Sequence, residues 1–392
     1  MAADMIFTSE SVTIGHPDKL CDRISDAAID AFLRQDAGAR AIVECAVATG
    51  VVFLAARFAA DSVVDLPSLA RRVIAEAGYV GPQFNARNCS ILTSIAEVPF
   101  ETREPTPEAP DDETIERRVA HEQANAFGYA CRETPELMPL PISLAHRLAR
   151  AIDHVRGDGM HWLSPDAKTQ VSVEYRNGKP VRVHGITLTA AVDPDLAGVD
   201  VEARLRQLVF DTLSGDGPVP DAQTTVDVIT GELYDIGGPT RHAGLTGRKN
   251  GIDTYGEIAR QSGAALSGKD PSRIDRIGAY AARHAAKNIV AAGLAERCEV
   301  HLAYAIGQAK PLSLSVETFG TGKRADDVIA QRVAAVLDFR PLAITRRFQL
   351  RTMPGLAGEA GFYRRLSAYG HFGRGDLDLP WEATDVADAL RG

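Results

Sequence analysis

The residues best suited to chemistry lie in two segments that combine glycines with cations. The segment GLTGRKNG (244–251) contains Arg248 and Lys249, and the segment SGKDPSRIDR (267–276) contains Lys269. Glycines let the backbone approach a ligand closely, and the cations indicate that this ligand is anionic. The first segment lacks the GxxxxGK[ST] spacing of a P-loop, which excludes a P-loop NTPase. Together the two segments predict a binding site for a polyphosphate.

Carboxylates at the starts of two predicted helices add ligands for a magnesium ion. In GHPDKLCD (15–22), His16 and Asp18 follow a glycine at the start of a helix, where free backbone N–H groups favour anions. Asp275 opens a second helix, and carboxylate oxygens suit Mg²⁺. The first segment is equally compatible with an ordinary helix N-terminus. Glu44 lies inside an apolar strand, where a carboxylate usually faces solvent.

Composition and charge exclude several classes of protein. The chain has 392 residues and a net charge of −9, so we expect no broad nucleic-acid-binding surface. Its five cysteines are widely spaced without a CxxC pair, which argues against a disulfide framework or a cysteine zinc site. We find no signal peptide and no apolar run of the ~18 residues that a membrane span needs. These features predict a cytoplasmic protein that binds neither nucleic acid nor membranes.

Predicted strand pairs recur three times along the chain, with helices between them. The strand pairs are expected at 41–58, 169–192 (with Asn177-Gly178 as the turn) and 298–320. Helices are expected at 16–36, 143–156 and 275–295. Strands and helices that alternate without a strict βαβ rhythm predict an α+β fold. We expect three similar domains, each a mixed or antiparallel sheet with helices on one face.

The segment between the first two units has a different composition. EVPFETREPTPEAPDDETIERR (97–118) is rich in proline and acidic residues, which predicts a linker or a mobile loop. A loop of this length in an enzyme often forms a lid over the active site. We therefore divide the chain into an N-terminal domain (1–100), a mobile active-site loop (101–118), a central domain (119–236) and a C-terminal domain (237–392).

Several long motifs, in the right order, resemble those of the S-adenosylmethionine synthetases (methionine adenosyltransferases). They extend from about Phe7 to Trp381 and include FTSESVTIGHPDKLCDRISDA, FGYACRETPELMPLPISLAHRL, PDAKTQV, GLTGRK, DTYG, SGKDPSRIDR, GAYAARHAAKNIVAAGLAERCEV, YAIGQAKPLSLSVETFGTGK and YGHFGR. The resemblance implies three similar α+β domains in a pseudo-threefold arrangement. It also implies a homodimer, often paired into a tetramer, with active sites at the dimer interface. In the implied reaction, the methionine sulfur attacks C5′ of ATP, and the expelled triphosphate is hydrolysed to pyrophosphate and phosphate.

The same resemblance implies roles for individual residues. The implied catalytic residues are His16, Lys168, Arg248 and Lys269. The implied ATP contacts are His16, Asp166, Lys168, Tyr234, Arg248, Lys249, Ala265 and Lys269, with Tyr234 in place of an aromatic residue that stacks on adenine. The implied cofactors are two Mg²⁺ ions per site, held by Asp18 and Asp275, and a K⁺ ion, held by Glu44.

The residues that hold the amino acid in the family differ in this chain. In this acceptor pocket, Arg57 stands where the family usually has Glu, Val98 where it has Gln, His242 where it has Asp, Arg273 where it has Lys, and Glu122 where it has Asp. Two carboxylates suited to an ammonium group have thus become basic, and a cation beside an ammonium is unfavourable. We predict S-adenosylmethionine formation from ATP and L-methionine. Two explanations of the changed pocket residues stay open. The acceptor lacks the ammonium or has extra negative charge, or the residues have drifted in a divergent enzyme that still uses methionine.

Two other classes of function are weighed against this prediction. A non-catalytic regulatory paralogue would have no evident use for a complete set of triphosphate and metal residues. A generic ATP-dependent kinase or ligase is disfavoured because the P-loop and protein-kinase spacings are missing.

Overall fold

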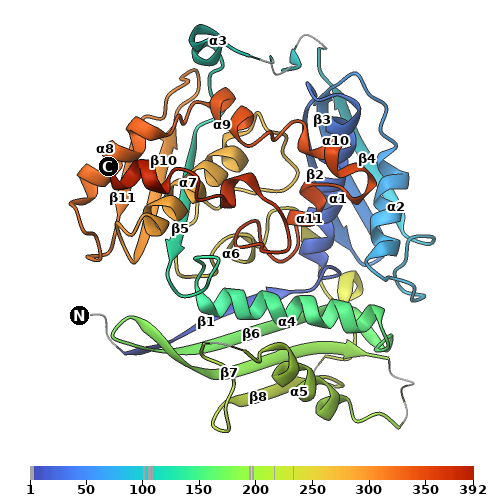
Figure 1. Ribbon diagram of the computed structural model, residues 1–392. Coiled ribbons are helices and arrows are strands. Elements are labelled where there is room, and N and C mark those ends of the chain that lie inside the picture. Colours follow the sequence, from blue (N-terminus) through green and yellow to red (C-terminus); the bar gives the residue numbers. More distant parts are fainter. Residues whose placement is uncertain are drawn as a thin grey trace.

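The computed structural model describes residues 4–99, 102–104, 107, 109–193, 196, 198–215, 217–232 and 234–392. Within these ranges the chain forms three sheets with helices packed on them, which confirms the predicted α+β class (Figure 1). In Figure 1 the N-terminal unit is blue, the central unit is green and lies below, and the C-terminal unit is orange.

The first sheet has the strand order β4-β3-β2-β9. β2 (Arg40–Ala48) and β3 (Val51–Ala59) form the predicted hairpin, β4 (Ser90–Glu97) pairs parallel to β3, and β9 (Gly244–Leu245) pairs antiparallel to β2. α1 (Pro17–Gln35), which confirms the helix predicted at 16–36, packs on β2 beside α2 (Leu66–Glu76). Alternate residues of β2 are buried, so the helices cover one face of this sheet and leave the other open.

The second sheet has the order β1-β6-β7-β8. Its strands are β1 (Met5–Val12), β6 (Leu163–Arg176), β7 (Lys179–Val192) and β8 (Thr225–Ile229). Asn177 and Gly178 join β6 to β7 with φ angles of 51° and 74°, as a tight hairpin turn requires. α4 (Leu140–Gly157) lies along this sheet in Figure 1, and α5 (Val201–Thr212) packs beside it.

The third sheet has the order β11-β10-β5 and is entirely antiparallel. Its strands are β5 (Ala124–Cys131), β10 (Arg297–Tyr304) and β11 (Ser313–Glu317). α7 (Ile274–Ala291) lies directly on β5, and α8 (Asp326–Val336) packs on β11. A Cβ at Gly128 would lie 2.0 Å from the backbone carbon of Ala282, so only glycine permits this close helix-to-strand approach.

Short helices complete the described part of the chain. They are α3 (Asp112–Arg117), η2 (Gly238–Thr240), α6 (Asn250–Asp253), α9 (Pro341–Arg347), α10 (Met353–Ala357), η3 (Gly358–Ala360), α11 (Tyr363–Leu366), η4 (Pro380–Glu382) and α12 (Ala387–Arg391). α3 lies within the segment 101–118, which was predicted only as a loop. Positions 101, 105, 106 and 108 of that segment lie outside the described residues.

Each sheet contains one strand from another part of the sequence. β1 comes from the N-terminal segment but joins the central sheet, β5 comes from the central segment but joins the C-terminal sheet, and β9 comes from the C-terminal segment but joins the N-terminal sheet. The sheets therefore do not follow the predicted domains 1–100, 119–236 and 237–392, because each of these domains contributes one strand to the sheet of another. Periodicity along the sequence gives strand positions, but it gives no information about which sheet a strand joins.

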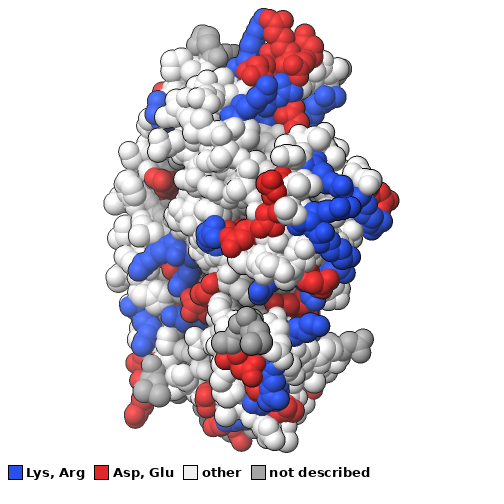
Figure 2. Space-filling view, turned by 90° about the vertical axis from the view of Figure 1, so that its left-hand side faces the viewer, with Lys and Arg blue, Asp and Glu red and all other residues white. Residues whose placement is uncertain are grey.

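The hydrophobic core and the surface follow from this arrangement. One large buried cluster joins the first and third sheets, and a second lies between α4, α5 and the central sheet. All five cysteines are free, in agreement with their spacing, and all five are buried. No helix in the described ranges is long and apolar enough to cross a membrane. Figure 2 shows acidic and basic side chains close together on the face that it displays.

Candidate active site

His16 lies at the point where β1 leads into α1. It caps the N-terminus of this helix, and its Nδ1 accepts a hydrogen bond from the backbone N–H of Asp18 at 3.2 Å. Pro17 in the first turn has the fixed φ that a helix start needs. The side chain is only 2% exposed, and burial lowers the pKa of His16 to about 3. The imidazole is therefore neutral at physiological pH.

Asp166 is the centre of a hydrogen-bond network beside His16. Its Oδ2 accepts hydrogen bonds from the Tyr234 hydroxyl at 2.7 Å and from the Gly238 backbone N–H at 2.8 Å, and it lies 3.2 Å from Nε2 of His242. Burial alone would raise the pKa of Asp166, but the hydrogen bond from His242 and the other donors lower it to about 2. The carboxylate is therefore ionised and held in one position.

Tyr234 takes part in this network through its hydroxyl. The guanidinium of Arg241 lies 4.5 Å from the centre of the Tyr234 ring, and Nζ of Lys168 lies 5.6 Å from it. One tyrosine thus contacts Asp166 through its hydroxyl and has Lys168, the cation predicted for catalysis, near its ring. The stacking of this ring on adenine stays a prediction.

The remaining cations of this cluster lie in the loop that follows β9. Arg248 Nη1 is 3.9 Å from Oδ1 of Asp18, and the same oxygen accepts a hydrogen bond from the Leu245 backbone N–H at 3.0 Å. Lys249 Nζ lies 3.5 Å from Glu10. The structure therefore brings eight predicted residues together around the start of α1: His16, Asp18, Asp166, Lys168, Tyr234, His242, Arg248 and Lys249.

A second cluster lies at the start of α7. Lys269 forms an ion pair with Asp275, and Arg273 Nη1 lies 3.0 Å from Oε2 of Glu122. The Lys269 backbone also forms a bridge with Ile42 of β2. No hydrogen bond or ion pair within the described ranges joins this cluster to the residues around α1.

The open face of the first sheet lies between the two clusters. Glu44 on β2 and Arg57 on β3 are exposed, and Val98, half-buried, follows β4. Ile42, which bridges to Lys269, and Ala46, which pairs with Leu245, are four residues apart on β2. At about 3.3 Å per residue, the two clusters are separated by roughly 13 Å of strand.

Ala265 lies against the GLTGRK loop. A Cβ at Gly247, whose φ is 77°, would lie 2.2 Å from the Cβ of Ala265. Glycine is therefore required here both by its backbone conformation and by the contact with Ala265.

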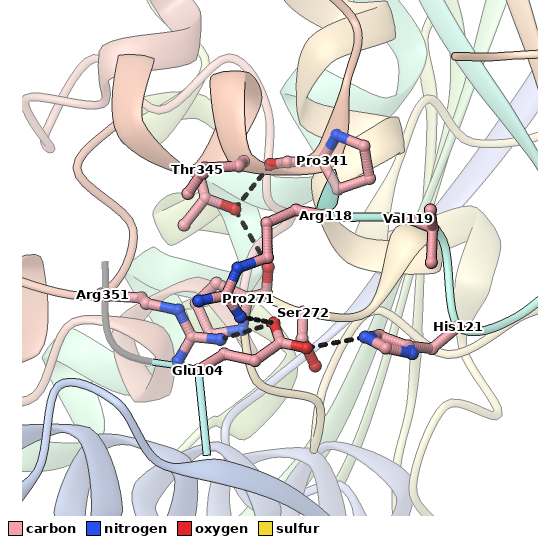
Figure 3. A pocket seen from close by; sticks show the side chains of 10 residues that line it. Glu104, Arg118, Val119, His121, Pro271, Ser272, Pro341, Thr345 and Arg351 are labelled. Atoms are coloured by element: carbon pink, nitrogen blue, oxygen red, sulfur yellow. Dashed lines mark hydrogen bonds and ion pairs between the residues drawn. The ribbon is translucent and has the colours of Figure 1, made fainter. Parts of the chain in front are cut away.

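Glu104, which sequence analysis did not single out, anchors the segment that was predicted as a lid. Its carboxylate contacts four basic side chains: His121 at 2.6 Å, Arg40 at 3.6 Å, Arg351 at 3.6 Å and Arg118 at 3.9 Å. Figure 3 shows Glu104 between Arg351 and His121, beside Pro271 and Ser272. Burial alone would raise the pKa of Glu104, but the hydrogen bond from His121 and the nearby arginines lower it.

Comparison with known proteins identifies the family. Models of the N-terminal, central and C-terminal domains of S-adenosylmethionine synthetase match residues 4–99, 117–229 and 236–383. The chain belongs to the S-adenosylmethionine synthetase family. S-adenosylmethionine synthetase sequences with curated names are also similar over nearly their whole length. The S-adenosylmethionine synthase of Synechococcus elongatus is 46% identical over 100% of this chain and 98% of its own length. The enzyme of Microcystis aeruginosa is 45% identical over 100% of this chain and 98% of its own length. That of Synechococcus sp. is 47% identical over 96% of this chain and 94% of its own length.

The carboxylates predicted to hold metal ions in this synthetase keep free oxygens. Oδ1 of Asp18 accepts a hydrogen bond from the backbone N–H of Leu245. Its Oδ2 accepts no hydrogen bond within the described part of the chain. Asp275 likewise contacts Lys269 through Oδ2 alone. Each carboxylate thus offers an oxygen to a hard cation, and the residues present fit Mg²⁺.

Proposed function

We propose that this chain forms S-adenosylmethionine from ATP and L-methionine, with release of phosphate and pyrophosphate. Family membership supports this reaction. The relatives named S-adenosylmethionine synthase, which are 45–47% identical over nearly the whole chain, support it as well. The single structural observation behind it is the gathering of Lys168, Arg248 and Lys249 around the neutral His16 at the start of α1. A prediction of cytoplasmic location, from cysteine usage, accompanies this proposal.

These cations suit the departure of a triphosphate. Negative charge grows on the triphosphate as the bond between C5′ and oxygen breaks, so fixed cations stabilise the transition state more than bound ATP. The methionine sulfur is already a nucleophile and needs no general base. His16 is neutral, and its Nδ1 accepts from Asp18, so its Nε2 has a proton to donate to the departing oxygen.

Asp18 and Asp275 would hold Mg²⁺, and Glu44 would hold K⁺. Such ions neutralise phosphate oxygens when they are bound. The protein itself contributes the ionised Asp166, whose position is fixed by three donors and which is suited to accept hydrogen bonds from the nucleoside.

The contacts of the altered acceptor residues support methionine rather than a more acidic substrate. Arg273 is paired with Glu122 at 3.0 Å, and His242 lies 3.2 Å from Asp166. A paired cation repels an ammonium less than a free one. Sequence alone suggested an excess of positive charge at Arg57 and His242, and the carboxylate of Asp166 reduces it at His242.

A homodimer with shared active sites forms a further part of the proposal. The residues Leu245, Ala46, Phe53 and Leu92 lie in register across the open face of the first sheet. Leu245, Phe53 and Leu92 are 47%, 42% and 55% exposed, which is unusual for a row of apolar side chains. A second copy would cover this row, and both cation clusters would then lie at the edge of the interface.

The reaction is tested by incubating the purified chain with ATP, Mg²⁺ and K⁺ and either methionine or its deaminated analogue. Formation of S-adenosylmethionine with equal amounts of phosphate and pyrophosphate is expected. Turnover of the deaminated analogue alone would support the changed acceptor. Release of ADP or AMP, or no reaction at all, would contradict the proposed chemistry.

A further inference from the structure

His16, Asp166 and His242 form a group with the composition of a transition-metal site. One ligand atom from each residue lies within 4.8 Å of the others. The two imidazole rings are neighbours, with centroids 4.9 Å apart and planes inclined at 49°. Two nitrogens and one carboxylate oxygen are the donors of many catalytic zinc sites, which keep a fourth position open.

The distances within this group are close to those of a tetrahedral site. Zinc lies about 2.0–2.1 Å from histidine nitrogen and about 2.0–2.2 Å from carboxylate oxygen, so neighbouring donors in a tetrahedron are about 3.3–3.5 Å apart. The contact between His242 Nε2 and Asp166 Oδ2 is already 3.2 Å. The three ligand atoms all lie within 4.8 Å of one another, so a tetrahedral arrangement needs only small side-chain rotations.

Asp166 provides an independent sign that a ligand is accommodated here. The residue is fully buried, and while Oδ2 accepts hydrogen bonds, Oδ1 is buried without any partner in the described structure. A buried carboxylate oxygen without a partner is unfavourable. A metal ion bound by both oxygens of the Asp166 carboxylate would give Oδ1 a partner.

Asp18 is placed to support His16 as a ligand. Its Oδ2 lies 3.8 Å from Nδ1 of His16. When Nε2 binds a metal, the ring proton moves to Nδ1, and the weak 3.2 Å contact from the Asp18 backbone is replaced by a hydrogen bond to this carboxylate. A metal-bound histidine commonly donates its other ring N–H to a carboxylate in this way.

We propose that His16, Asp166 and His242 bind one divalent transition-metal ion of the Zn²⁺ or Co²⁺ type, with the fourth position open to solvent or substrate. Imidazole nitrogens select such ions over Mg²⁺, so the ion differs in type from the Mg²⁺ expected at Asp18 and Asp275. Because all five cysteines are buried, they do not compete for the ion. If the proposed function is correct, the ion occupies two nucleotide contacts, His16 and Asp166, and therefore inhibits ATP binding.

Titration of metal-free, untagged protein with Co²⁺ in excess Mg²⁺ tests the site without any enzyme assay. We expect one Co²⁺ per chain with the intense visible bands of a four-coordinate ion, and displacement of these bands by Zn²⁺. His242→Asn keeps a hydrogen-bond donor for Asp166 but removes the nitrogen ligand, so its affinity should fall at least tenfold. His154→Ala, at an exposed histidine of α4, is the matched control and should bind as the wild type does.

Two results would overturn the proposal: the absence of a four-coordinate Co²⁺ spectrum in the wild type, or equal affinity in His242→Asn. Thermal unfolding without metal checks that this variant is folded. A second experiment measures the binding of an ATP analogue with and without Zn²⁺. A four-coordinate Co²⁺ spectrum in a protein without synthetase activity would support the metal site and contradict only the proposed function.

Discussion

Replacing Asp166 by Asn removes the charge at the centre of the nucleotide cluster. In the wild type, one carboxylate oxygen accepts from Tyr234, Gly238 and His242, and the residue is fully buried. Asparagine has nearly the same shape, so packing is unchanged. Its amide oxygen, however, is a weaker acceptor for these three donors, and its NH2 group takes the buried position of Oδ1, where it finds no partner in the described structure.

The size of the effect follows from the pKa of Asp166. A decrease from 3.8 to about 2 means that the folded protein favours the ionised form by about 2 kcal/mol. A donor left without a partner in the variant adds roughly 1–3 kcal/mol. We therefore expect Asp166→Asn to lower the free energy of unfolding by about 3–5 kcal/mol at neutral pH.

The pH dependence has a definite sign. Because the folded pKa is lowered, the charge of Asp166 stabilises the fold fully above its unfolded pKa of 3.8, and this stabilisation is lost as pH falls through about 2. About half of the charge contribution should remain at pH 3. Urea unfolding of the wild type and Asp166→Asn at pH 7, 5 and 3 measures this, with the exposed Asp227→Asn as control. A stability difference below about 1 kcal/mol at pH 7, or one that grows as pH falls, would refute the reasoning.

Three further changes test other parts of the account. Glu104→Gln removes a contact shared by four basic side chains, and we expect trypsin to cleave at Arg103 and Arg118 faster than in the exposed control Glu113→Gln; equal rates would exclude an anchoring role. Phe53→Glu places a charge in the exposed apolar row and should convert a dimer to monomers in light scattering, whereas a dimeric variant would show that this face is not the interface. Lys269→Ala should lower kcat about a hundredfold because a fixed cation is lost, and a kcat within about twofold of the wild type would argue against its catalytic role.

Local patterns in the sequence predicted most individual elements. Asn177-Gly178 marked its hairpin because few residues adopt positive φ at both positions, and the helix at 16–36 formed as α1. The exchange of strands among the three sheets was not predicted. β1 pairs with β6 over a separation of more than 150 residues, and no local pattern specifies such a partner.

The candidate site was predicted in a similarly uneven way. Motifs located the cations Arg248 and Lys249 because glycine-rich loops with cations have a recognisable composition. The partners of His242 and Arg273 were not predicted, since Asp166 and Glu122 lie 76 and 151 residues away in the sequence. Glu104 was missed because it lies in a segment whose composition indicates a loop. A single acidic residue in such a segment does not reveal that four basic side chains contact it in the fold.

The most direct test of the central claim is mass spectrometry of the products formed from ATP and L-methionine, with separate quantification of the phosphates. We expect the adenosyl sulfonium product together with one phosphate and one pyrophosphate for each molecule formed. Products in which the adenosine remains attached to phosphate, or triphosphate cleavage without transfer to methionine, would contradict the account.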